Sequence, residues 1–260
     1  MVLPLGDTEP TRTVPVATYA LIALNVLMFL VQLARGEAFT TSYAATPYEI
    51  THGEDIPDWF ALPLASVESE GVLPSRDDIE GRLVRQEPVP FPVWLTLLTS
   101  LFLHGSPLHL AGNMLFLWIF GDNVEDVLGH ARYVVVYLAC GLSGSLAQVF
   151  ANPDSLIPTL GASGAIAGVM GIYMMWFPYH RVRVLLLNIV VEFPAVFVIG
   201  FWIAVQVWNG LGSIKQLGLV GGVAYLSHLG GAACGVVAAL IYRGRARRLG
   251  HPGWGDRVRG

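Results

Sequence analysis

The chain has 260 residues, of which 54% are hydrophobic and only 13% are charged, and its formal net charge is −4. A soluble globular domain usually carries about a quarter charged residues, so this composition excludes an ordinary soluble domain. We expect the surroundings of this chain to be a lipid bilayer, and we expect no nucleic-acid partner.

Apolar runs with few or no charges divide the chain into expected membrane spans. A helix crosses the hydrocarbon core with about 20 apolar residues, and shorter runs must end in a region lined by protein. The runs occupy residues 17–34, 107–121, 133–151, 155–179, 193–214 and 216–242. The sequence therefore predicts an all-α polytopic membrane protein with six transmembrane helices and a long first loop.

The segments around these runs complete the predicted organisation. In chain order we expect an N-terminal segment at 1–16, the first transmembrane helix at 17–35, a long loop at 36–106, the remaining five-helix part at 107–243 and a basic tail at 244–260. Within the loop, residues 93–104 around Trp94 are expected to form a helical piece at the membrane interface. Pro194 favours the start of the fifth span, so the stretch 182–192 is expected to be an interfacial loop. A glycine-rich turn at 210–222 precedes the sixth span.

Basic residues predict the orientation. On a six-span plan, ten of the 15 Lys and Arg residues lie on the side of the two termini, and five lie on the other side. Positive residues favour the cytoplasm, so both termini are predicted to be cytoplasmic and the long loop external. One Lys against 14 Arg is typical of a GC-rich bacterial genome, which points to the inner membrane of a bacterium.

Polar groups inside a span are costly and therefore mark functional positions. Three of the spans that enter from the external side carry such groups near that end. His109 and Asn113 lie one turn apart on a single face of the second span, Ser163 begins the fourth, and His228 lies about two turns into the sixth. All of these groups are predicted to lie in one layer near the external surface.

Small residues indicate how the fourth and sixth spans pack. Both spans carry glycines at helical spacing, and in the sixth these share a face with His228. The glycines are Gly164, Gly168, Gly171, Gly231 and Gly235. Small residues four apart let helices approach closely in membranes. Docking of the two faces would bring Ser163 within hydrogen-bond reach of His228.

This pair has the chemistry of a nucleophile and its base. A serine hydroxyl attacks a carbonyl once a neutral imidazole removes its proton. His109 and Asn113 can donate hydrogen bonds to the developing oxyanion, and the backbone N–H of Ser163 lies at a helix N-terminus. No carboxylate falls in the external half of a span, so the sequence predicts a Ser–His dyad and not a triad.

The pattern resembles the rhomboid intramembrane proteases from about residue 93 to residue 242. The matching motifs are His104-x4-His109-x3-Asn113, then Gly161-Ala162-Ser163-Gly164, then His228-x2-Gly231-x3-Gly235. The resemblance implies a six-helix membrane domain in which Ser163 is the nucleophile and His228 the base. It also implies that His109 and Asn113, beside Gly161, bind the oxyanion.

The same resemblance implies two structural residues and shows two departures. His104 would be a structural member of the external loop, and Glu125 would tie the cytoplasmic loop. Many rhomboids carry a Tyr that stacks on the histidine where this chain has Ala167. The Trp-Arg pair that is frequent in the first loop is also missing, because Leu95 follows Trp94. The motifs therefore do not identify the group that holds His228.

Other interpretations of these residues remain open. Ser163 alone could be a helix cap, and His228 or Asn113 could be interhelical hydrogen-bonding groups. A zinc protease is disfavoured because no H-E-x-x-H run exists, and a transporter would carry polar groups in both leaflets. We expect no metal or cofactor, and simple packing for Cys140 and Cys234. A catalytically inactive rhomboid-like binding protein is the main alternative.

The expected substrates are transmembrane segments of other membrane proteins. A helical substrate hides its peptide carbonyls in its own hydrogen bonds, so Gly, Pro and other helix-weakening residues near the external end should favour cleavage. The resemblance to the rhomboid family also implies that the fifth span, which carries Phe197, Phe201 and Trp202, serves as a lateral gate for such substrates.

Overall fold

The computed structural model describes residues 2–8, 10–55, 60–61, 84–85, 87–215 and 224–251. Three predicted features lie partly or largely outside these residues. They are the middle of the long loop, the glycine-rich turn before the sixth span and the end of the basic tail.

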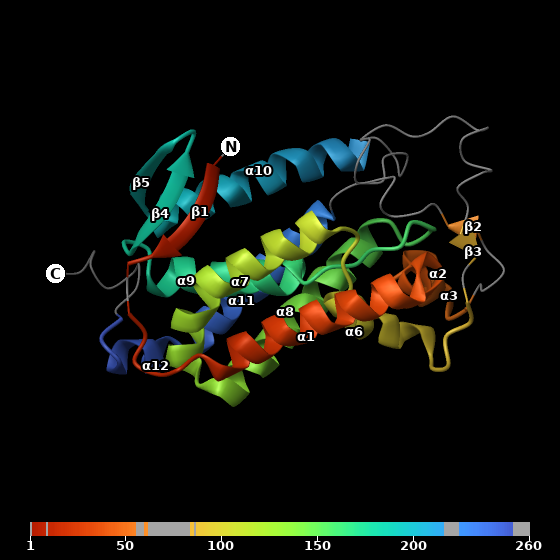
Figure 1. The fold of residues 1–260 in the computed structure, drawn as a ribbon, viewed down its shortest axis with the longest axis horizontal. Coiled ribbons are helices and arrows are strands. Elements are labelled where there is room, and N and C mark those ends of the chain that lie inside the picture. Colours follow the sequence, from red (N-terminus) through yellow and green to blue (C-terminus); the bar gives the residue numbers. More distant parts are fainter. Residues whose placement is uncertain are drawn as a thin grey trace.

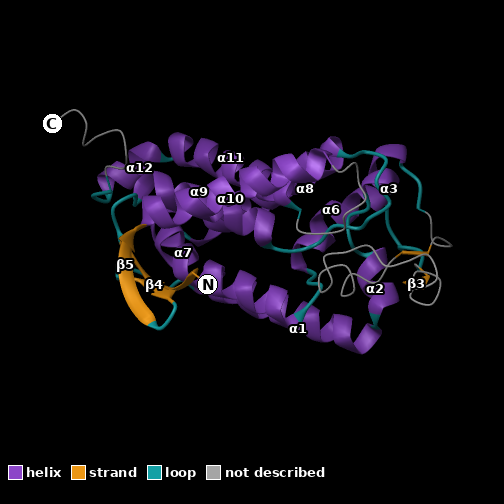
Figure 2. Ribbon diagram, turned by 90° about the horizontal axis from the view of Figure 1, so that it is seen from above, coloured by secondary structure: helices purple, strands orange, loops and turns teal. Residues whose placement is uncertain are grey.

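Within the described residues, long helices run roughly along the longest axis of the molecule (Figures 1 and 2). These are α1 (Val16–Arg35), α7 (Pro107–Leu128), α8 (His130–Ala151), α9 (Ser163–Trp176), α10 (Ala195–Lys215) and α11 (Tyr225–Ile241). By length and composition, α1 and α8 could each cross a membrane, and α9, α11 and residues 195–210 of α10 are shorter apolar helices. The prediction of a mostly helical chain is confirmed.

The expectation of an all-α chain is too narrow, because one end of the bundle carries an antiparallel sheet (Figure 2). Its strand order is β1-β4-β5, with β1 at Val2–Asp7, β4 at Arg181–Leu186 and β5 at Ile189–Pro194. The stretch predicted as an interfacial loop is thus a hairpin. In β4 the buried Val182 and Val184 alternate with the exposed Arg181 and Arg183, which is the period of a strand. We call this end, which also carries α12 (Arg243–Arg248), the sheet end.

The opposite end of the bundle, which we call the loop end, carries the short helices of the first loop (Figure 1). These are α2 (Glu37–Ser42), α3 (Pro47–His52), η1 (Val93–Leu95), α6 (Thr96–Thr99) and η2 (Ser100–Phe102), with the short strands β2 (Phe60–Ala61) and β3 (Val84–Arg85). Ala45 and Thr159 exchange two backbone hydrogen bonds of 2.9 Å. The first loop is thereby joined to the turn that precedes α9.

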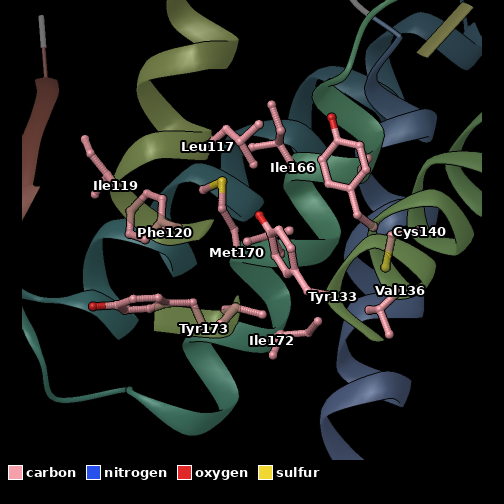
Figure 3. Close-up of a cluster of buried hydrophobic side chains, with 14 of the residues drawn as sticks. Leu117, Ile119, Phe120, Tyr133, Val136, Cys140, Ile166, Met170, Ile172 and Tyr173 are labelled. Atoms are coloured by element: carbon pink, nitrogen blue, oxygen red, sulfur yellow. The ribbon is translucent and has the colours of Figure 1, made fainter. Parts of the chain in front are cut away.

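Large side chains fill the space between α7, α8 and α9 (Figure 3). Phe120, Tyr133, Ile166 and Met170 are buried in one cluster. Cys140 lies in the same cluster, and both it and Cys234 are free, as expected. In a bilayer such packing depends on van der Waals contact, because lipid tails are as apolar as the side chains that they surround. Close fit therefore fixes the relative positions of these helices.

Candidate active site

Glycines set the distance between α9 and α11. A Cβ built on Gly231 or Gly235 would collide with the backbone carbonyl of Gly164 or Gly168, respectively. A Cβ on Gly171 would lie 2.7 Å from the carbonyl oxygen of Ala232. Real Cβ atoms do not approach carbonyl oxygens so closely, so both helices need glycine along this seam. The backbones therefore lie almost in contact, which places the first turn of α11 beside the start of α9.

Ser163 and His228 meet at the loop end of this seam. Ser163 is the first residue of α9, and His228 lies in the first turn of α11 with only 6% of its surface exposed. Ser163 Oγ lies 2.8 Å from His228 Nε2, which is a hydrogen-bond distance. A hydroxyl and an imidazole from two separate helices thus share one partly buried contact.

A third residue, Gln206 of α10, contacts the other ring nitrogen of His228. Gln206 Oε1 lies 2.8 Å from His228 Nδ1, and Gln206 is 7% exposed. An amide oxygen can only accept, so Nδ1 carries the hydrogen in this pairing and Nε2 is left to accept from Ser163. Gln206 is not among the site residues predicted from the sequence. The sequence signal that could have identified it is a polar amide side chain within the charge-free apolar run 193–214.

Trp202 lies one turn before Gln206 on the same helix and also reaches His228. The centroids of the two rings are 5.4 Å apart and their planes are inclined by 38°. Ala167, at the position where the family often has Tyr, is buried and offers no ring. The histidine is therefore contacted by side chains of α10 instead of an aromatic residue of α9.

The candidate oxyanion donors lie on α7. Asn113 is 9% exposed, and its Nδ2 has no hydrogen-bond partner among the described residues. Gly161 has a φ of +125°, and a Cβ there would lie 3.1 Å from the His109 ring and 3.6 Å from Ser163 Oγ. Its own N–H donates to Ser100 O at 2.9 Å. Gly161 therefore provides space between His109 and Ser163 and does not itself offer a donor.

His104 lies behind His109, with its ring centroid 5.2 Å away in an edge-to-face arrangement. Gln32 of α1 holds its backbone from both sides, because His104 N donates to Gln32 Oε1 and Gln32 Nε2 donates to His104 O, each at 3.0 Å. Burial, with a smaller contribution from His109, lowers the pKa of His104 to about 3. His104 is consequently a neutral, buried residue of the segment that leads into α7.

Glu125 lies near the other end of α7, so it is not part of this cluster. Its carboxylate accepts hydrogen bonds from Ala17 N, Thr18 N and Thr18 Oγ1 at 2.7–2.8 Å. His130 Nδ1 lies 2.5 Å from the same group. A carboxylate at a helix N-terminus satisfies free N–H groups and complements the helix dipole. Glu125 thus joins the start of α1 to the turn between α7 and α8.

The described residues include no group of three or more His, Cys, Asp or Glu side chains that could hold a metal ion. The geometry around Ser163 is instead of the kind that serine hydrolases use, in which a base accepts the hydroxyl proton through one nitrogen and is oriented through the other.

Comparisons with known proteins identify the family. The rhomboid domain model matches residues 92–245, which is more than half of the chain, so the chain belongs to the rhomboid family. It is 31% identical to Rhomboid protein 1, mitochondrial, of Saccharomyces cerevisiae over 60% of this chain and 45% of that protein. It is 36% identical to the Rhomboid protease GluP of Bacillus subtilis over 53% of this chain and 26% of that protein. The chain thus matches less than half the length of these two relatives. Family membership implies a polytopic membrane fold.

Proposed function

We propose that this protein is an intramembrane serine endopeptidase in which Ser163 is the nucleophile and His228 the general base. The observation that carries the proposal is the 2.8 Å contact between Ser163 Oγ and His228 Nε2 inside a bundle of apolar helices. A neutral imidazole at this distance is suited to remove the hydroxyl proton as the oxygen attacks a carbonyl carbon.

The proposed reaction proceeds in two halves. Ser163 Oγ bonds to the carbonyl carbon of the scissile peptide while its proton moves to His228 Nε2, and the carbonyl oxygen becomes an oxyanion. Asn113 Nδ2 and the His109 ring donate to that oxyanion. The tetrahedral intermediate expels the amine, which takes the proton from His228, and an acyl-enzyme remains. Water, deprotonated by His228, then releases the acid and restores Ser163.

The proposed substrates are transmembrane helices that contain Gly, Pro or other helix-weakening residues near their external ends. Their carbonyls must leave the helical hydrogen bonds before Ser163 can attack, and such residues lower the cost of unwinding. The proposed site of cleavage is close to the outer face of the membrane. Ser163 begins α9 next to the turn that pairs with the first loop, which supports this placement.

The proposed topology has six transmembrane helices, both termini in the cytoplasm and the loop 36–106 outside, in the inner membrane of a bacterium. The excess of basic residues on the side of the termini supports this orientation. The sheet end would then face the cytoplasm.

A fluorophosphonate probe tests the proposed nucleophile in protein purified in mild detergent. Such probes react with activated serine hydroxyls, so we expect the wild type to be labelled and Ser163→Ala to remain unlabelled. Ser155→Ala, in the turn after α8, is a matched control that should keep full labelling. A folded wild-type protein that stays unlabelled, but co-purifies with a membrane protein, would support the inactive binding protein instead.

A further inference from the structure

We propose that Gln206 is a positioning residue that holds His228 in the tautomer required for catalysis. This inference rests on the proposed function, and it adds a third member to the predicted dyad. The members come from three helices: Ser163 from α9, His228 from α11 and Gln206 from α10. Both contacts of the imidazole measure 2.8 Å.

The direction of these two hydrogen bonds carries the argument. A neutral imidazole has one N–H and one lone pair, on different nitrogens. Because Gln206 Oε1 accepts from Nδ1, the lone pair lies on Nε2, where it faces the Ser163 hydroxyl. In the other tautomer, Nδ1 would present its lone pair to the lone pairs of Oε1, and Nε2–H would point at Ser163. In that tautomer the contact between Nδ1 and Oε1 would be repulsive, and Nε2 could not accept the proton of Ser163.

An amide suits this position better than a carboxylate would. Gln206 is buried within an apolar helix, and a charged side chain there would be costly in a membrane. The amide also leaves the imidazole without a charged partner in the resting state. Among the described residues, His109 of α7 is the titratable group with an electrostatic effect on His228. Ser163 and Trp202 face it from α9 and α10 as uncharged groups.

Helix α10 therefore packs in the bundle and also positions the proposed base, His228, through two of its side chains. Gln206 and Trp202 lie four residues apart and so project from one face, toward His228. Phe197, Phe201 and Trp208 of the same helix are 68%, 64% and 80% exposed, so this helix packs inward through a limited part of its surface. A shift of α10 away from α11 would remove both supports of the imidazole together.

Kinetics of two substitutions test this role on cleavage of a transmembrane substrate. Gln206→Leu should lower kcat by about 10- to 100-fold with KM unchanged, which is part of the roughly 10²- to 10⁴-fold that a general base contributes. Gln206→Glu keeps an acceptor at Nδ1 and should retain more activity than Gln206→Leu. The acid limb of the pH profile of kcat should move to higher pH in Gln206→Glu, because a carboxylate stabilises the protonated imidazole and raises its pKa. Gln148→Leu on α8 is the control and should behave as wild type.

A spectroscopic measurement keeps the proposal testable if Gln206→Leu does not fold. The ¹⁵N shifts of the His228 ring in the wild-type protein at neutral pH should report Nδ1–H and an unprotonated Nε2. Protonation at Nε2 alone would overturn the proposal, as would wild-type kcat and an unshifted pH profile in both variants. Serine-specific labelling of the wild type would still support the proposed protease in those cases, so the two failures are distinguishable.

Discussion

The two ends of the bundle hold their polar residues in different ways. At the loop end, the contacts around Ser163 are made by a hydroxyl, an imidazole and an amide. At the sheet end, the hydrogen bonds around Glu125 and Asp7 are accepted by carboxylates. Glu125 accepts from the first turn of α1, and Asp7 of β1 accepts from Asn123 Nδ2 and Tyr173 Oη at 2.7 and 2.6 Å.

If the proposed function holds, this difference corresponds to a division between stability and chemistry. Hydrogen bonds to a charged group contribute roughly twice as much as neutral ones, so carboxylates are suited to fasten the termini of α1, α7 and β1. Under the proposed function, neutral groups leave the Ser163 hydroxyl and the Asn113 amide able to respond to charge that develops only in the transition state. Substitutions of the residues that surround Ser163 should therefore reduce turnover, and substitutions of the sheet-end carboxylates should reduce stability.

The largest effect is expected from loss of the reacting pair. Ser163→Ala or His228→Ala should reduce cleavage of a transmembrane substrate by at least about 10⁴-fold, because the nucleophile or its activation is lost. The thermal midpoint of both variants should remain near that of the wild type, because the hydrogen bonds that are lost join neutral groups. Mass spectrometry of the cleaved substrate and thermal unfolding measure the two quantities. Residual cleavage above 1% in Ser163→Ala would contradict the division.

Asn113→Ala should give the next largest effect. Removal of one oxyanion donor typically lowers kcat by about 100- to 1000-fold, and KM should change little because the donor acts on the transition state. Asn152→Ala, in the turn after α8, provides a matched control with normal turnover. Equal losses in kcat and in thermal stability would instead indicate that Asn113 serves helix packing.

Glu125→Gln should lower stability and leave turnover unchanged, which is the opposite of the behaviour expected for Asn113→Ala. In the variant, an uncharged amide replaces the carboxylate that accepts from Ala17 N and Thr18 N, and its NH₂ group would face one of these N–H donors. The free energy of unfolding should therefore fall by about 2–4 kcal/mol. Below its unfolding temperature the variant should retain wild-type kcat. Glu37→Gln, an exposed substitution on α2, should change neither quantity. A large loss of kcat in folded Glu125→Gln would argue against the separation of the two ends.

The sequence pointed to the candidate reactive side chains more directly than to the residues that contact them. Ser163, His109, Asn113 and His228 are conspicuous because each is polar in an apolar run, and their motifs led to the rhomboid family, which the domain match confirms. Gln206 supports the imidazole through a hydrogen bond between distant helices, and no local spacing encodes such a contact. The pairing of β1 with β4 was not predicted for a similar reason, because the two strands lie more than 170 residues apart. The hairpin of β4 and β5 is local, and the alternation of Val and Arg in β4 was its sequence signal.

The smallest effect is expected from His104, whose contacts with Gln32 were also not predicted from the sequence. The imidazole has its ordinary pKa near 6.5 when unfolded and a pKa of about 3 when folded, because burial opposes its charge. Between these two pKa values the unfolded chain binds more protons than the folded chain. The contribution of neutral His104 to the free energy of unfolding is therefore fully present above pH 6.5 and is lost as the pH falls toward 3. Between pH 7 and pH 5 this loss is about 2 kcal/mol. Unfolding measured at both pH values should show it in the wild type and in the exposed control His52→Gln, but not in His104→Gln. An identical pH dependence in all three proteins would mean that His104 takes up its proton without leaving the folded loop end.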